Sequence, residues 1–366
     1  MSKYCVELEP IEYYFLGNER SFGFGRNNKG IYNNYFVISE NLPTQTTLLG
    51  MMRYFVLKRM NLLNKNFSSQ GLTAQQIEKQ KEFIGRSSFI MSCNDKLEYG
   101  VIKKISPMFL KNNKKQILVK TPFNGSFDNN KIKLRGLQED VCKIMDGSSE
   151  RDFKLIDKID LKKEDDYRDS YVLLDDLSVI ENSEIFKSHV KVGINRYLDE
   201  DGFFKKEYKF FKDYKLCFYV TLDDTKLNLD DKITDVVYLG AEKSAFKLTM
   251  YKENDNLEET IKKTLKIDDG VYYYALSDLA CEDANKLNEC CDLIFLETRN
   301  FRCLKTNYDK DNFYHKLEQS ELYNFIRAGS VFFVNEAREQ DFEHLFENEN
   351  LKNIGFNQII KIGGNN

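Results

Sequence analysis

Short runs in which apolar and polar residues alternate most constrain the fold of this chain. The run Tyr4–Glu9 alternates in this way, and Leu216–Leu222 and Phe246–Met250 repeat the pattern. Because successive side chains of a strand point to opposite faces, each run predicts a half-buried strand. Shorter apolar runs bounded by charges or glycine predict further strands at 117–119, 171–174, 190–194, 236–239, 271–275, 293–296 and 331–334.

Helical periodicity is rarer. From Thr46 to Leu63 apolar residues recur every three to four positions, which predicts a helix with one buried stripe. Pro43 disfavours helical conformation before it and a threonine can cap the first amides, so we expect this helix to begin within Thr44–Thr47. Gly50 costs about 1 kcal/mol relative to alanine inside a helix, which we interpret as the sign of a close packing contact.

Further helices are expected at 73–84, 257–265 and 277–285. Strands mixed with occasional helices, without regular β-α-β spacing, predict an α+β architecture with antiparallel sheets.

Composition limits the partners of the chain. Its 366 residues suffice for two domains, and 42% hydrophobic residues with 28 phenylalanines support folding. Charged residues nearly cancel, leaving a net charge of −4 and a pI near 5.7. Any contact with nucleic acid must therefore come from a local basic patch, and acidic faces can meet basic partner proteins.

The sequence predicts no membrane segment, metal site or cofactor. It lacks an apolar run long enough to span a bilayer and opens in a strand-like alternation rather than a signal peptide, so we expect a cytoplasmic protein. The 8 cysteines form no Cys-x-x-Cys pair, and the adjacent Cys290 and Cys291 are awkwardly placed to share a metal. The 3 histidines, His189, His315 and His344, have no metal-motif spacing.

Two neighbouring motifs carry a family resemblance. Arg20 precedes the aromatic and glycine-rich loop Ser21–Arg26, and the order Pro-Thr-x-Thr-Thr-Leu-x-Gly-x-x-Arg follows at 43–53. This order resembles the opening of the third subunit of the type III-B CRISPR effector, the Cmr complex, in the RAMP superfamily. Segments 188–196, 237–245, 327–333 and 354–364 are similar to later stretches of that family.

The resemblance implies a fold and a division of the chain. Members of the superfamily look like paired ferredoxin-like (RRM-like) domains with antiparallel sheets and long insertions. The charged segment Glu139–Asp169 suits a boundary or insertion. We therefore expect an N-terminal ferredoxin-like domain with insertions at 1–180, and a C-terminal one at 181–366 that ends in a glycine-rich loop.

The resemblance also implies a role in antiviral defence. The expected protein is a non-catalytic structural subunit that binds the 5′ repeat-derived tag of the guide RNA. It would dock the large polymerase/cyclase-like subunit and contact neighbouring RAMP backbone subunits.

Candidate RNA contacts are residues whose side chains suit phosphate. Arginine can bind phosphate in a bidentate manner, lysine can meet it as a point charge, and a helix start offers amides and hydroxyls. The candidates are Arg20, Arg26, Thr46, Thr47, Lys191, Arg196, Lys243 and Ser244. The glycines of the candidate loops, where bare backbone allows close approach, are Gly23, Gly25, Gly240, Gly355, Gly363 and Gly364. An ordinary helix cap at the threonines and a merely solvated Lys191 remain alternatives.

Three other functions remain open from the residues alone. An endoribonuclease that processes guide RNA would use His189 as its acid or base. Asp175 and Asp176 follow an apolar run, as in a polymerase palm, but lack the glycines expected before them. A protein-interaction module without RNA contact also fits the near-neutral charge.

Overall fold

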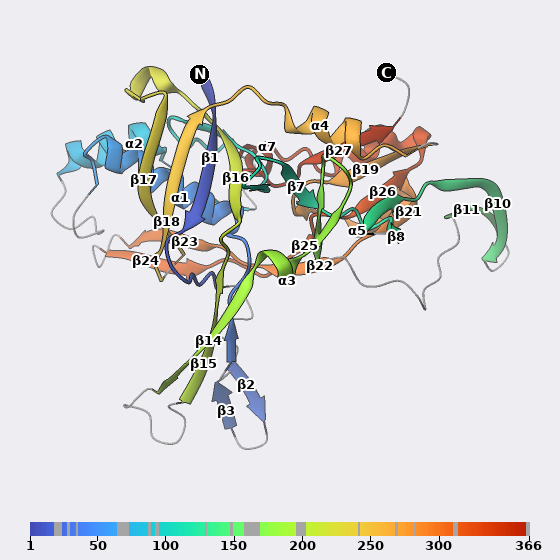
Figure 1. Ribbon diagram of the computed structural model, residues 1–366, viewed down its shortest axis with the longest axis horizontal. Coiled ribbons are helices and arrows are strands. Elements are labelled where there is room, and N and C mark those ends of the chain that lie inside the picture. Colours follow the sequence, from blue (N-terminus) through green and yellow to red (C-terminus); the bar gives the residue numbers. More distant parts are fainter. Residues whose placement is uncertain are drawn as a thin grey trace. The chain divides into compact units, whose positions relative to one another are not determined.

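The computed structural model is a mixed α+β fold with mostly antiparallel sheets, which confirms the predicted class at that level (Figure 1). It describes residues 1–17, 24–27, 30–33, 36–63, 73–86, 89–91, 95–128, 130–146, 149–156, 169–194, 203–240, 242–267, 270–281, 283–309 and 314–363.

The chain divides into two compact units that interleave along the sequence. Unit 1 comprises 1–108, 185–254 and 300–323, and unit 2 comprises 109–184, 255–299 and 324–366. The sequence predicts one boundary near residue 180 instead. The physical reason for the difference is strand pairing, because the first strand of the chain pairs with strands that lie after residue 210.

The main sheet of unit 1 is built around β1 (Ser2–Pro10). This strand pairs antiparallel with β16 (Tyr214–Leu222) and β18 (Ser244–Lys252), and the outer strands are β5 (Ile102–Ile105) beside β16 and β17 (Lys232–Leu239) beside β18. All five residues of Tyr4–Leu8 are buried. The strand is therefore covered on both faces rather than half-buried as predicted.

The helices of unit 1 are α1 (Gln45–Arg59) and α2 (Ala74–Ile84). α1 begins where predicted, with Thr44 as its N-cap, but ends before Leu63, and Asn61 follows it with φ of 52°. Gly50 is exposed, and a Cβ built there would meet no atom within 4 Å. Our interpretation of Gly50 as a close packing contact within the chain is therefore wrong.

A three-stranded sheet in unit 1 consists of β14 (Lys187–Ile194), β15 (Phe203–Phe210) and β4 (Phe36–Ile38). β14 runs antiparallel to β15, and β4 runs parallel to β15. Two hairpins and a 3₁₀ turn complete the unit: β2 (Phe24–Asn27) with β3 (Gly30–Asn33), β23 (Leu304–Asp309) with β24 (Tyr314–Gln319), and η1 (Asp224–Lys226).

Among the described residues, the two larger antiparallel sets of strands in unit 2 have four strands each. The first has the order β13 (Val179–Glu181), β12 (Ser170–Leu173), β7 (Ile117–Lys120), β6 (Phe109–Asn112). The second has the order β21 (Cys291–Phe295), β26 (Val331–Val334), β19 (Val271–Ala275), β27 (Ile359–Gly363). Its core clusters around Phe332, Phe342 and Phe346.

Short elements fill the rest of the described chain. The hairpins of unit 2 are β8 (Gly125–Asp128) with β9 (Lys131–Leu134) and β10 (Leu137–Asp146) with β11 (Ser149–Ile156). The others are α3 (Asn182–Ile185), α4 (Leu257–Thr264), β20 (Leu279–Ala280), α5 (Ala284–Cys290), β22 (Thr298–Phe301), β25 (Tyr323–Ile326), η2 (Glu336–Arg338), α6 (Glu339–His344) and α7 (Glu349–Asn353).

One local prediction is corrected in unit 2. The helix expected at 277–285 is wrong, because Leu279 and Ala280 pair with β25. The helix starts later, at α5, since the Asp283 carboxylate accepts hydrogen bonds from the amides of Asn285 and Lys286 at 3.0 and 3.2 Å. The segment Glu139–Asp169, expected as a boundary or insertion, contains most of the β10–β11 hairpin.

Candidate nucleic-acid interface

The start of α1 gathers three hydroxyl groups. The Thr44 Oγ1 atom accepts a hydrogen bond from the Thr47 amide at 3.3 Å and lies 3.0 and 2.9 Å from the hydroxyls of Thr46 and Thr47. The buried Gln45 side chain anchors this turn by donating to the Ser106 carbonyl at 3.1 Å. Thr44 is thus an ordinary helix cap, and the predicted Thr46 and Thr47 lie half-buried beside it.

α1 runs antiparallel to β17. Near the end of α1, the Lys58 ammonium donates to the Asp235 carboxylate at 2.7 Å and to the Val236 carbonyl at 3.2 Å. One turn earlier, Tyr54 makes an edge contact with Tyr238, with 6.2 Å between ring centres. Residues nearer the start of α1 therefore contact residues nearer the end of β17.

The start of α1 consequently lies at the same end of unit 1 as the turn between β17 and β18. A second set of contacts supports this placement. A Cβ on Gly240 would lie 3.3 Å from the Phe15 carbonyl oxygen, and the neighbouring Leu16 accepts a hydrogen bond from the Glu40 amide at 2.8 Å. Glu40 leads directly into Thr44 along the chain.

The turn itself requires left-handed backbone. Gly240 has φ of 70°, a conformation that favours glycine, and Lys243 has φ of 53°. The Lys243 amide donates to the Gly240 carbonyl at 3.1 Å and closes the turn. The Lys243 side chain is exposed.

Ser244 has a structural task. It is buried, and its hydroxyl accepts a hydrogen bond from the Phe15 amide at 2.9 Å and donates to the Phe15 carbonyl at 3.3 Å. These bonds fix the chain after β1 against β18. We therefore remove Ser244 from the candidate RNA contacts.

Lys191 lies directly opposite Lys206 in the β14–β15 ladder. Their ammonium groups lie 4.8 and 5.2 Å from the centre of the same Tyr208 ring, and Lys206 also lies 3.8 Å from the centre of the Phe15 ring. Lys206 is buried, which lowers its pKa, whereas Lys191 is exposed. Like charges directly opposite each other in a sheet are destabilising, so this arrangement has an electrostatic cost.

Glu242 joins this pair to the β17–β18 turn. Its carboxylate forms an ion pair with Lys206, and it directly precedes Lys243 in the chain. We call Lys191, Lys206 and Lys243 the lysine cluster. Two of its members, Lys191 and Lys243, come from sequence motifs that lie about fifty residues apart.

Sequence reasoning missed Lys206 and its aromatic neighbours. The signal was present, because the strand 203–210 contains three lysines among three phenylalanines and a tyrosine. Basic residues mixed with aromatic ones are typical of RNA-binding surfaces.

Several predicted residues fall elsewhere. Arg20, Arg196, Gly23 and Gly364 lie outside the described residues, and for Arg26 and Gly25 only the backbone in β2 is described. In unit 2, Gly355 and Gly363 have φ of 94° and 86°. A Cβ on Gly363 would lie 2.2 Å from the Gly270 carbonyl oxygen, so this glycine lets β27 approach β19.

The residues of the catalytic alternatives lie in different units, His189 in unit 1 and Asp176 in unit 2. The exposed His189 ring stacks on Tyr13, with 4.8 Å between ring centres. The Asp176 carboxylate accepts from the Ser178 amide and hydroxyl at 3.0 and 2.7 Å, and these bonds lower its pKa. Within the described residues, no three His, Cys, Asp or Glu side chains are placed to hold a metal ion together. No described helix is long and apolar enough to cross a membrane.

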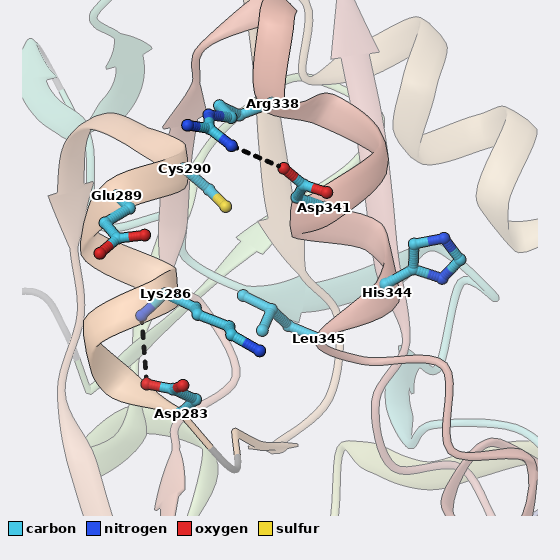
Figure 2. Close-up of a pocket in the computed structure, with 8 residues that line it drawn as sticks. All are labelled: Asp283, Lys286, Glu289, Cys290, Arg338, Asp341, His344 and Leu345. Atoms are coloured by element: carbon cyan, nitrogen blue, oxygen red, sulfur yellow. Dashed lines mark hydrogen bonds and ion pairs between the residues drawn. The ribbon is translucent and has the colours of Figure 1, made fainter.

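Unit 2 has a pocket of about 420 Å³ between α5 and α6 (Figure 2). Lys286 extends from α5 towards Leu345, and Arg338 forms an ion pair with Asp341 at 3.1 Å. The remaining lining residues are Asp283, Glu289, Cys290 and His344. Burial raises the pKa of Cys290, which keeps this thiol in its unreactive form. Two cations, Lys286 and Arg338, and three carboxylates, Asp283, Glu289 and Asp341, line the pocket, so its charge is mixed.

Comparison with known proteins finds likeness in solved structures only. No family profile matches the sequence, and no curated protein matches it. A chain of the cryo-EM structure of Type III-B Cmr-beta bound to cognate target RNA aligns with a TM-score of 0.46 at 13% identity, over 97% of this chain and 96% of that one. A chain of the same assembly bound to cognate target RNA and AMPPnP aligns with a TM-score of 0.44 at 12% identity, over 97% and 95%.

A chain of the apo Cmr-beta structure aligns more weakly. Its TM-score is 0.25 at 11% identity, over 68% of this chain and 96% of that one. This chain is thus similar to chains of Type III-B Cmr-beta structures.

Proposed function

We propose that this protein is a non-catalytic structural subunit of a type III-B CRISPR effector, and that unit 1 holds the 5′ repeat-derived tag of the guide RNA. The observation that carries this proposal is the lysine cluster at the β17–β18 turn. Lys206 lies opposite Lys191 and pairs with Glu242, the residue before Lys243, so two segments that resemble the family are connected through Lys206. The start of α1, which belongs to a third segment, lies at the same end of unit 1.

The electrostatics of the cluster suit a phosphate backbone. Lys191 and Lys206 face the same tyrosine ring, and the single carboxylate of Glu242 pairs with Lys206. A phosphate beside Lys191 would relieve the repulsion between the two ammonium groups. The half-buried hydroxyls of Thr46 and Thr47 can donate to further phosphate oxygens, as commonly happens at helix starts.

The same proposal includes the finer features implied by the family motifs. These are two ferredoxin-like domains, docking of the large polymerase/cyclase-like subunit, contacts with neighbouring RAMP subunits, and a place in the cytoplasm. Arg20, Arg26 and Arg196 remain proposed contacts on sequence grounds.

RNA binding by the full chain tests the proposal. The probe is a fluorescent guide RNA with its repeat-derived 5′ tag, titrated over a salt series, against the double variant Lys191→Gln/Lys243→Gln. We expect weaker binding and a smaller salt dependence, because each phosphate contact to a single strand contributes about 0.7 to the slope of log K against log salt. Two lost contacts should lower that slope by about 1.4.

A matched variant separates local from general charge effects. Lys104→Gln/Lys232→Gln removes two exposed lysines of unit 1 on β5 and at the start of β17. It should bind the tagged RNA with an almost unchanged slope. If both double variants lose RNA affinity equally, the lysine cluster attracts RNA only through nonspecific charge, and the proposed site is overturned.

A further inference from the structure

Aromatic rings gather on one face of the paired strands β14 and β15, which lie side by side in Figure 1. His189 of β14 lies directly opposite Tyr208 of β15, and Phe210 stands two residues further along β15. Residues that lie opposite each other, or two apart on one strand, share a face of the sheet. These three rings therefore belong to the same face.

Tyr13 joins this face because its neighbour in the chain pairs with β15. The amides of Tyr14 and Lys209 each donate to the other residue's carbonyl at 2.9 Å. The ring centre of Tyr13 lies 4.8 Å from that of His189, with 29° between the ring planes, and 5.5 Å from that of Phe210. Tyr13 and His189 therefore form a stacked pair held against β15.

This ring pair is open to solvent. Tyr13 is 45% exposed, and His189 is exposed beside it. Within the described residues, the side chains of Tyr13 and His189 make ring contacts but no hydrogen bond or ion pair. Flat rings that stack outside the core can accept a further flat group.

The ring pair lies next to two members of the lysine cluster. Lys191 follows His189 by two residues on the same face of β14, a separation of about 6.6 Å along a strand. Tyr208, opposite His189, has the ammonium groups of Lys191 and Lys206 at 4.8 and 5.2 Å from its ring centre. A stacking surface and a pair of cations thus stand side by side.

This combination matches the chemistry of an unpaired nucleotide. Proteins that bind single-stranded RNA stack splayed bases on tyrosine, phenylalanine or histidine rings, while cations follow the phosphate backbone. A nucleotide carries a base and a phosphate together. One nucleotide can therefore meet the ring pair and Lys191 at the same time.

We propose that Tyr13 and His189 form a stacking platform for an unpaired base of the guide RNA tag, next to a phosphate held by Lys191. The inference rests on the proposed function and names the part of the RNA that contacts this face. Every base has a flat face, so such a platform holds a base without reading its identity. His189 binds RNA in this arrangement and transfers no proton.

Removing the bases and the rings in one cycle tests this inference. The probes are the guide RNA with its intact 5′ tag and the same RNA with abasic residues throughout the tag. Each is titrated against the full chain and against Tyr13→Leu/His189→Leu. We expect the variant to bind the intact RNA about tenfold more weakly and the abasic RNA as well as the unmodified chain does. Equal weakening for both RNAs, or for neither, overturns the platform.

Two matched variants locate the effect on this face. Tyr13→Phe keeps the ring and should bind both RNAs as the unmodified chain does. Phe36→Leu removes a ring that is 40% exposed on the opposite face of the same sheet, where Phe36 lies beside Lys205. It should keep the preference for the intact RNA. If Phe36→Leu loses this preference and Tyr13→Leu/His189→Leu keeps it, the base stacks on the other face and the inference is refuted.

The salt dependence separates this inference from the proposed phosphate site. Tyr13→Leu/His189→Leu removes no lysine, so the slope of log K against log salt should stay unchanged while the affinity falls. If Lys191→Gln/Lys243→Gln leaves the slope unchanged but the ring variant loses its preference for the intact RNA, the phosphate site fails and the platform stands. The opposite pair of results overturns the platform alone.

Discussion

β1 and β14 are both strands of unit 1 that alternate in sequence, yet their surroundings are opposite. β1 lies between two antiparallel neighbours, and every residue from Tyr4 to Leu8 is buried. β14 has one described neighbour, and its residues from Lys187 to Val192 are all exposed. Alternation thus identifies a strand, whereas the number of strands and layers packed around it decides whether one face, both faces or neither is covered.

Charged residues in the two strands find different partners, as the difference in burial requires. In β1, the buried Glu7 carboxylate accepts from Lys215 at 2.6 Å and from the Tyr251 hydroxyl at 2.7 Å. In β14, the exposed Lys191 lies over the Tyr208 ring, with its ammonium 4.8 Å from the ring centre. A buried charge must find partners within the fold, whereas an exposed one remains available to a ligand.

The largest expected effect compares truncations in the two strands. Leu8→Ala removes a fully buried side chain and should lower the free energy of unfolding by about 2–5 kcal/mol. Val192→Ala, at a residue 58% exposed, should change it by less than about 0.5 kcal/mol. Chemical denaturation of each variant measures both values. Similar losses of unfolding free energy in the two variants would mean that Val192 is buried in the isolated chain and that β1 and β14 do not differ in burial.

A smaller effect is expected at Gly50, which extends the comparison to α1. This glycine is exposed, with open space around its Cα, so Gly50→Ala should stabilise the chain by about 0.5–1 kcal/mol through helix propensity. Thermal unfolding of the chain measures the gain. If RNA affinity falls while stability rises, the bare backbone at Gly50 allows the close approach of RNA. A loss of stability would contradict the finding that no atom lies near a Cβ at Gly50.

The smallest effect concerns acid stability at Glu207. Burial raises the pKa of this carboxyl, but hydrogen bonds from Lys209 and Ser188 lower it more, so the pKa lies below its ordinary value of 4.5. A carboxyl with a lowered pKa in the folded state stabilises the protein above its unfolded pKa, and this stability is lost as the pH falls through the folded pKa.

The variant Glu207→Gln should therefore flatten the decline in unfolding free energy below about pH 4.5 by a few tenths of a kcal/mol. Denaturation at several pH values checks this result. If the unfolding free energy of the variant declines with falling pH as steeply as that of the unmodified chain, the ion pair between Glu207 and Lys209 contributes nothing to stability.

Part of the candidate site was predictable from local chemistry. The threonine start of α1, the positive φ at Gly240 and the strand containing Lys191 each follow from a few neighbouring residues. The burial of Ser244 did not follow, because its hydrogen-bond partner Phe15 lies 229 residues away in sequence. The role of Lys206 was equally hidden, since it depends on the ladder with Lys191 and the ion pair with Glu242.

The sequence alone predicted ten of the 27 described strands and the start of α1, because alternation, periodicity and capping act over a few residues. It also determined that any basic surface must be local, since the net charge is −4. The tertiary structure was needed to show that β1 is internal and β14 an edge among the described strands, and that the two units interleave along the sequence. It was also needed to show that Lys191 lies opposite Lys206, which pairs with the Glu242 carboxylate next to Lys243 in the chain. These outcomes depend on pairing between residues far apart in the chain, which a local pattern does not encode.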